Sequence, residues 1–238
     1  MSASMIEASE KSTVTRAQIA DSIWLDGRLA IWHETSNWLA LSDVHYGYEL
    51  SRKAIGGLWP NWGMAAIEER LGEMIDEYAP EKLILVGDII DSSFVGMEGI
   101  QFLEKIIERT PGEVIFVEGN HDRGTIKAKF DWVPQFDIDG FLFHHGHQPT
   151  PLGDYKTEVV GHFHPSVNLR DGAGMSLRIP SLVQESYKNQ ADRWVLPAFS
   201  PWAGGGRFKI AEGCESARQW VASTTRVFEL HDPTLLDR

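Results

Sequence analysis

In the first half of the chain, short apolar runs alternate with longer segments of helical periodicity. The runs at 38–42, 83–86 and 114–117 predict buried strands. Apolar residues three and four positions apart predict amphipathic helices over 64–78 and 96–109. This alternation of strand and helix is typical of a parallel sheet with helices packed on it.

Beyond residue 140 the apolar runs are shorter and their connections are brief. The chain there predicts strands at 141–143, 158–160, 177–179, 194–199 and 226–230. This pattern indicates a mostly β second half that forms a second sheet packed on the first. Near the N-terminus, Asp26-Gly27 between two apolar runs predicts a hairpin, whereas the glycine- and proline-containing segment 46–63 predicts an irregular loop.

Length and composition favour one domain over two small ones. The chain has 238 residues, of which 42% are hydrophobic. We expect a disordered tail over residues 1–20 and a single domain over residues 21–238. The sequence predicts no membrane span or signal peptide, and a single cysteine excludes an internal disulfide framework, so we expect a cytoplasmic protein. The net charge of −12 disfavours a surface that binds duplex nucleic acid through its phosphates.

Polar side chains follow the predicted strands, where α/β sheets usually bind their ligands. Five of the nine histidines fall between residues 144 and 164. The candidate ligand set is Asp43, His45, Asp88, Asn120, His145, His162 and His164. It contains imidazoles, carboxylates and an amide but no thiolate, which suits divalent first-row metals better than structural zinc. Seven ligands exceed what one ion needs and fit two ions that share a carboxylate.

Five motifs occur in order along the chain: Asp43-x-His45, Gly87-Asp88-x-x-Asp91, Gly119-Asn120-His121-Asp122, His145-Gly146-His147 and Gly161-His162-x-His164. Together they resemble the calcineurin-like metallophosphoesterase superfamily. The resemblance implies an α/β (α+β) fold, a four-layer αββα sandwich of two packed mixed β-sheets flanked by helices.

The same resemblance assigns a role to each candidate ligand. Asp43, His45 and His164 are implied to bind a first metal ion, and Asn120, His145 and His162 a second. Asp88 is implied to bridge the two. Two divalent ions are therefore expected, with Mn²⁺ as the first choice, although these ligand types also permit Fe, Ni or Zn.

The implied reaction is phosphoester hydrolysis by attack of a metal-bound hydroxide. His121 is implied to protonate the departing oxygen as general acid, and the carboxylate of Asp91 to orient its ring. Arg123 either contacts a substrate phosphate or pairs with a nearby acid at the surface. His144 is expected to be structural and Asp122 a turn residue, and His147 either supports the site or lies on the surface.

A second resemblance concerns segments 43–49 and 196–206. They are similar to the small ICC-like phosphoesterases, whose bacterial relatives are often associated with DNA ligases. This implies hydrolysis of phosphodiesters more than of monoesters. Two alternatives remain open: a nuclease acting on DNA ends or single strands rather than on nucleotides, and a non-catalytic metal-binding scaffold. The presence of both His121 and Asp91 favours an enzyme.

Overall fold

The first sheet has seven strands in chain order, and β4 lies at its centre. The computed structural model describes residues 15–150, 153–170 and 174–230. The strands are β1 (Arg16–Ala20), β2 (Ile23–Asp26), β3 (Ala30–His33), β4 (Trp38–Ser42), β5 (Lys82–Val86), β6 (Glu113–Val117) and β7 (Trp132–Val133). β1 to β4 pair antiparallel and β4 to β7 pair parallel, so the carboxyl ends of β4, β5 and β6 share one edge.

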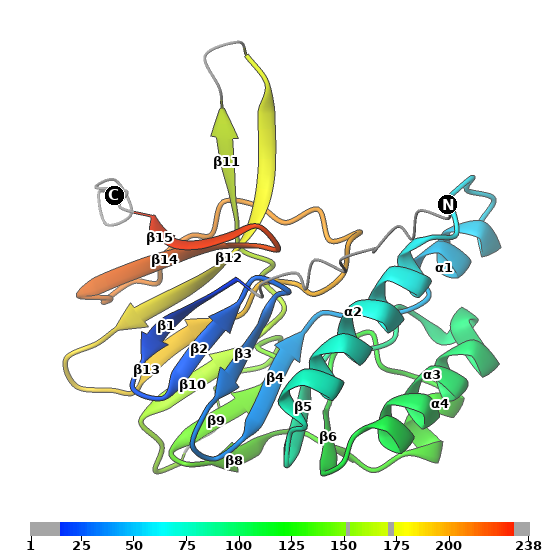
Figure 1. Cartoon of the computed structure of the whole chain (residues 1–238), viewed down its shortest axis with the longest axis horizontal. Helices are drawn as coiled ribbons and strands as arrows, with labels where there is room; N and C mark the ends of the chain where they lie inside the picture. The colour runs from blue at the N-terminus through cyan, green and yellow to red at the C-terminus, as the bar shows by residue number, and fades with distance from the viewer. Residues whose placement is uncertain (1–14, 151–152, 171–173, 231–238) are drawn as a thin grey trace, which may run out of the picture.

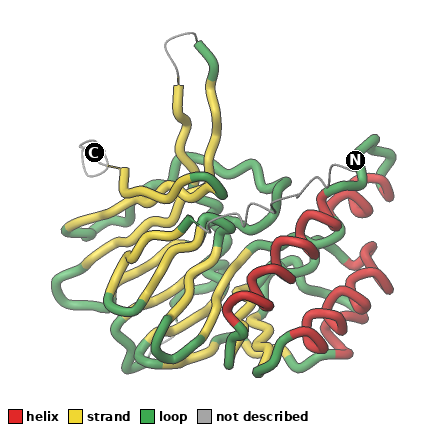
Figure 2. The backbone as a smooth tube through the Cα atoms, viewed as in Figure 1, coloured by secondary structure: helices red, strands yellow, loops and turns green. Residues whose placement is uncertain are grey.

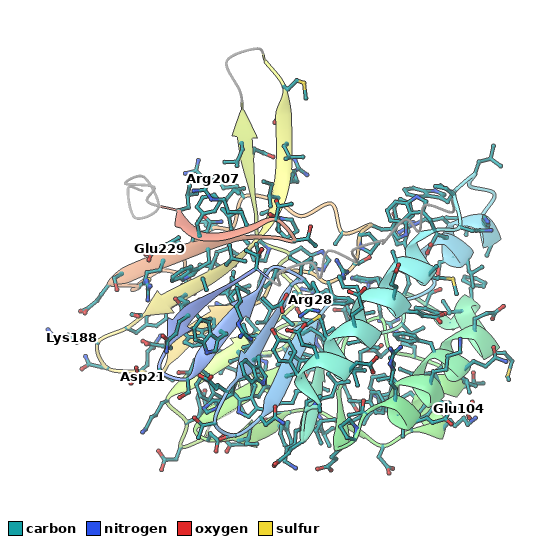
Figure 3. All side chains as sticks on the ribbon, in the orientation of Figure 1. Asp21, Arg28, Glu104, Lys188, Arg207 and Glu229 are labelled. Atoms are coloured by element: carbon teal, nitrogen blue, oxygen red, sulfur yellow. The ribbon has the colours of Figure 1, made fainter. Side chains whose placement is uncertain are left out.

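The helices cover this sheet on the side away from the second sheet (Figures 1 and 2). They are α1 (Tyr48–Ala54), α2 (Gly63–Tyr78), the 3₁₀ turn η1 (Ser93–Val95), α3 (Gly96–Arg109) and α4 (Thr125–Lys129). Ile67 and Leu71 of α2 are fully buried, as helical periodicity requires of the face that packs on the sheet. Arg28, labelled in Figure 3, joins the β2–β3 turn to α2 by ion pairs of 2.7 Å to both Asp26 and Glu77.

The second sheet has eight strands, of which seven follow the order β15-β14-β12-β13-β10-β9-β8 and the eighth, β11, lies off this path and pairs with β12. The seven are β8 (Phe136–Ile138), β9 (Phe141–His144), β10 (Thr157–Val160), β12 (Ser176–Ser186), β13 (Asp192–Val195), β14 (Ser216–Ser223) and β15 (Arg226–Leu230). β11 (Ser166–Arg170) pairs with the first part of β12, and this pair projects from the body in Figure 1. β9, β10 and β13 are parallel to one another.

Aromatic side chains fill the space between the two sheets. Trp38 of β4 is fully buried, and its ring centroid lies 5.5 Å from that of Phe141 and 5.4 Å from that of Phe143, both on β9. Because side chains alternate along a strand, Trp38, Ala40 and Ser42 share the face toward the second sheet. This packing brings the parallel ends of the two sheets together, as the bridge between Ser42 and Ala198 shows.

The predicted mixed α/β class and the two packed sheets are confirmed, with corrections in detail. Residues 16–20 form β1 rather than part of a disordered tail, because they pair with β2; residues 1–14 lie outside the described chain. The predicted loop 46–63 contains α1. All helices of the described residues come from 48–129, so the helical layer expected over the second sheet is not found there. The described segments that link its parallel strands β9, β10 and β13 are loops and the β11–β12 pair rather than helices. No described helix has the length and apolar character needed to cross a membrane.

Candidate metal centre

The polar residues that follow five parallel strands converge where the two sheets meet. The loop after β4 runs beside the loop after β5, since Asp43 N donates to the Gly87 carbonyl (3.1 Å) and His45 N to the Asp88 carbonyl (2.9 Å). From the second sheet, the backbone N–H of His162 donates to the carboxylate of Asp43 at 3.0 and 3.1 Å. The predicted ligands from both halves of the chain therefore occupy one region.

Two separate groups of these residues could each hold a cation. The first group is Asp43, His45 and His164, and one ligand atom of each lies within 4.8 Å of those of the other two. In this group His164 Nε2 is 3.0 Å from Asp43 Oδ1. The second group is Asp88, His145 and His162, whose ligand atoms also lie within 4.8 Å of one another.

Asp88 belongs to the second group but also faces the first. Its Oδ2 is 3.1 Å from His145 Nε2 in the second group and 4.0 Å from His45 Nε2 in the first. Its Oδ1 accepts a hydrogen bond from the backbone N–H of His121 (2.8 Å). One carboxylate oxygen is thus committed to the fold, and the other faces imidazoles of both groups.

Two buried ligand atoms here, Nε2 of His45 and Oδ1 of Asn120, have no hydrogen-bond partner among the described residues, whereas Nδ1 of His45 and Nε2 of His145 face the carboxylates of Asp91 and Asp88 at 3.4 and 3.1 Å. Burial of such atoms without a partner costs free energy, which a coordinated cation would offset. Together with the surrounding carboxylates and imidazoles, these atoms fit divalent metal ions.

The backbone at these positions is unusual. Ten described non-glycine residues have positive φ, and five of them are predicted ligands: Asp43, His45, Asp88, His162 and His164, with φ between 44° and 68°. Each such conformation costs about 1–3 kcal/mol and is typically found where function requires it. Glycine makes the close approach possible, since a Cβ at Gly87 would collide with the His145 ring and one at Gly161 would lie 2.7 Å from Asp43 Oδ2.

Comparison with known proteins agrees with this arrangement. A family model described as calcineurin-like phosphoesterase matches residues 37–221, most of the chain. The chain belongs to the calcineurin-like phosphoesterase family. No curated protein sequence matches it closely enough to count as a relative.

Solved structures resemble the chain to different degrees. The nuclease MPE of Pseudomonas putida matches with a TM-score of 0.68 and 25% identity, over 92% of this chain and all of that one. A dimetal phosphatase from Danio rerio matches with a TM-score of 0.38 and 8% identity, over 81% of this chain and 97% of that one, and contributes nothing to the argument.

In this phosphoesterase, the charges of the centre stabilise one another. Burial alone would lower the pKa of His45 and of His145, but the neighbouring carboxylates outweigh it and raise both. Burial alone would raise the pKa of Asp88, but His145, the backbone N–H of His121 and His45 together outweigh it and lower the pKa. The site therefore favours ionised carboxylates and added positive charge, which a divalent cation also supplies.

His121 and Asp91 are adjacent, but their contact differs from the predicted one. His121 Nδ1 bonds the backbone carbonyl of Asp91 at 2.6 Å, whereas the Asp91 carboxylate lies 3.4 Å from Nδ1 of His45. The prediction that the Asp91 carboxylate orients the His121 ring is therefore wrong in this contact, because the carboxylate faces the predicted metal ligand His45 instead. His45, Asp91 and His121 form a third group within 4.8 Å, which shares His45 with the first.

Asp122, predicted to be a turn residue, connects two loops of the site. The side chain is buried, and its Oδ1 accepts hydrogen bonds from the N–H groups of Ile89 and Ile90, each at 2.9 Å. Its Oδ2 accepts one from Gly119 N, also at 2.9 Å. Asp122 therefore ties the loop after β5 to the loop after β6, and so holds Asp88 and Asn120 in place.

Asp122→Asn is expected to lower the free energy of unfolding by about 1–3 kcal/mol, because an amide nitrogen would face a buried N–H. Burial raises the pKa of Asp122 to about 6, so urea unfolding should be compared at about pH 8, where the wild-type group is ionised. The exposed Asp131→Asn is the control. Equal stability of both variants would show that Asp122 does not hold the loops.

The remaining candidates have distinct surroundings. Arg123 is exposed, and its Nε donates to the backbone carbonyl of Asn120 (2.7 Å). His144 is buried, with Nε2 2.7 Å from Glu158 Oε1, in agreement with the expected structural position. His147 is exposed, and its ring centroid lies 5.3 Å from that of His145.

Proposed function

We propose that this protein hydrolyses phosphodiester bonds with two divalent metal ions, most readily Mn²⁺. The observation that supports this most is the position of the Asp88 carboxylate, which faces His145 of the second group and His45 of the first. Asp43, His45 and His164 would hold one ion, Asn120, His145 and His162 the other, and Asp88 both. Bound there, the ions would neutralise phosphate oxygens and lower the pKa of a water molecule.

His121 is the proposed general acid, and its hydrogen bond to the Asp91 carbonyl determines which ring nitrogen donates the proton to the leaving group. A backbone carbonyl can only accept, so the bond to Asp91 O requires a hydrogen on Nδ1 of His121. Nε2 then carries the exchangeable proton, which the protonated ring can give to the departing oxygen. The Asp91 carboxylate is proposed to orient His45, since histidine ligands commonly pair their second nitrogen with a carboxylate.

We propose a nucleic acid or nucleotide diester as the substrate. The nuclease from Pseudomonas putida, matched over nearly the whole chain at 25% identity, supports this choice. The motifs at 43–49 and 196–206 support placement among the ICC-like, DNA-ligase-associated enzymes. Arg123 is proposed to contact a substrate phosphate from the rim of the site.

A cytoplasmic location is also proposed, and the single cysteine of the chain agrees with it.

Metal removal and reloading test the proposal. Protein stripped by a chelator and reloaded with Mn²⁺, Fe²⁺, Ni²⁺ or Zn²⁺ should be assayed on bis(4-nitrophenyl) phosphate, 4-nitrophenyl phosphate, cyclic nucleotides and single-stranded DNA. We expect stripped protein to be inactive, about two ions to bind per chain, and diesters to react faster than the monoester.

Two results would contradict the proposal in different ways. Hydrolysis that persists after complete metal removal would exclude the metal-dependent reaction. Metal binding without turnover of any of these esters would favour a metal-binding scaffold.

A further inference from the structure

Four aromatic rings gather beside the first ligand group. Trp202 lies in the loop after β13, and its ring centroid is 4.5 Å from that of Trp62, 5.2 Å from Trp59 and 6.1 Å from Tyr48. Tyr48 and Trp59 contact edge to face at 5.1 Å. These residues, which we term the aromatic wall, come from the start of α1 (Tyr48), the loop between α1 and α2 (Trp59 and Trp62) and the loop after β13 (Trp202).

The wall is tied to the first ligand group at several points. Tyr48 N donates to the carbonyl of His45 (3.1 Å). The loop that carries Trp202 is anchored on both sides, because Ser200 N donates to the carbonyl of Asp43 (2.9 Å) and Gly206 N to that of His164 (3.2 Å). In Figure 1 this orange loop reaches toward the start of α2. The wall therefore borders the residues proposed to hold the first metal.

The rings are not a buried core. Trp62 is 50% exposed, and Tyr48, Trp59 and Trp202 are partly exposed. Aromatic side chains that belong to a hydrophobic core are normally buried. Exposed aromatic side chains beside a site are typical of a surface that binds a ligand. Gly63 lets the Trp202 indole pack at the start of α2, where a Cβ would collide with it.

Basic side chains lie beside the wall, although the chain as a whole is acidic. The Arg52 guanidinium lies 4.6 Å from the Tyr48 ring centroid, and Lys53 beside it is exposed. The whole chain nevertheless carries a net charge of −12, so it repels a polyanion at long range. Long-range attraction would therefore add little to the affinity for a nucleic acid, whereas base stacking on aromatic rings adds affinity that does not depend on phosphate charge.

We infer that the aromatic wall is a stacking subsite for an unpaired nucleobase next to the phosphodiester being cut. This rests on the proposed phosphodiesterase function and adds to it the residues that select a nucleotide substrate. A base inside a duplex has no free face to stack on a protein ring. The subsite therefore selects single-stranded nucleic acid over duplex.

Binding of a fluorescent dT12 by Mn²⁺-loaded protein tests the inference. Both proteins compared carry His121→Ala to slow cutting, and one also carries Trp62→Ala. We expect Trp62→Ala to weaken binding about 5- to 150-fold, the range of one base–aromatic stack. Trp62→Phe should restore most of the affinity. Leu58→Ala, at a fully exposed neighbour, is the control and should bind as the parent does.

An abasic unit moved along the oligonucleotide makes the test specific to stacking. When the abasic unit stands at the position that stacks on Trp62, the parent protein should lose affinity and the Trp62→Ala protein should lose almost none. The reason is that the abasic unit and the substitution remove the same base–ring contact. The dependence of binding on salt should be the same in both proteins, since stacking releases no counterions.

The inference and the proposed function can fail separately. Equal dT12 binding by parent and Trp62→Ala, or no abasic position that distinguishes them, would overturn the stacking subsite even if phosphodiester hydrolysis is observed. A duplex bound more tightly than dT12 would overturn it as well. Binding that depends on Trp62 in a protein without hydrolytic activity would keep the subsite and refute the proposed reaction.

Discussion

Asp88→Asn is expected to leave the protein folded but to remove at least one metal ion and to reduce phosphodiester hydrolysis about 10³-fold or more. Asparagine can keep its oxygen where Asp88 Oδ1 accepts from His121 N, so the loop contact survives. The NH₂ group would then replace Oδ2, which faces His145 and His45. An amide nitrogen donates hydrogen bonds and cannot bind a cation, and loss of metal stabilisation costs several kcal/mol of activation free energy.

Elemental analysis and the initial rate on bis(4-nitrophenyl) phosphate measure the two effects together. Asp137→Asn, an exposed position on β8, makes the same chemical change away from the site and should keep full metal content and rate. If Asp88→Asn kept both ions at full occupancy, Asp88 would not be the shared carboxylate.

The strands β2 to β6 and the long helices α2 and α3 were predictable because their patterns are local, whereas β7, β8, β11 and β14 were not predicted. The apolar run 38–42 is β4, and the periodic segment 96–109 is α3. β1 was missed because its exposed positions look like a polar tail, and only pairing with β2 makes it a strand. α1 was missed because a seven-residue helix beside glycines and tryptophans has too short a pattern to read.

The candidate site shows the same division between local and long-range information. Strand-end motifs indicated which residues converge, and the structure brings the predicted histidine and aspartate ligands into two groups. The target of the Asp91 carboxylate was not predictable, since it depends on where His45 and His121 lie in space. The hydrogen bonds of Asp122 likewise reach residues more than thirty positions away. The positive φ angles of the ligands also arise from the assembled loops rather than from residue type.

His121→Ala tests whether this histidine gives a proton or binds metal, because the structure allows either. Its ring lies in the third group with His45 and Asp91, yet Nδ1 is already bonded to the Asp91 carbonyl. As a general acid, it should contribute about 10²–10⁴-fold when the leaving group is a nucleoside alkoxide. A nitrophenolate leaves without needing a proton, so the rate on bis(4-nitrophenyl) phosphate should fall much less. Metal content should stay at the wild-type value.

The two substrates control for each other, because general disruption of the site would slow both reactions equally. The ratio of rates on bis(4-nitrophenyl) phosphate and on single-stranded DNA should therefore rise in His121→Ala. An unchanged ratio together with loss of an ion would make His121 a ligand. The first metal ion would then be held by the third group, with His121 and Asp91 in place of His164 and Asp43 beside His45.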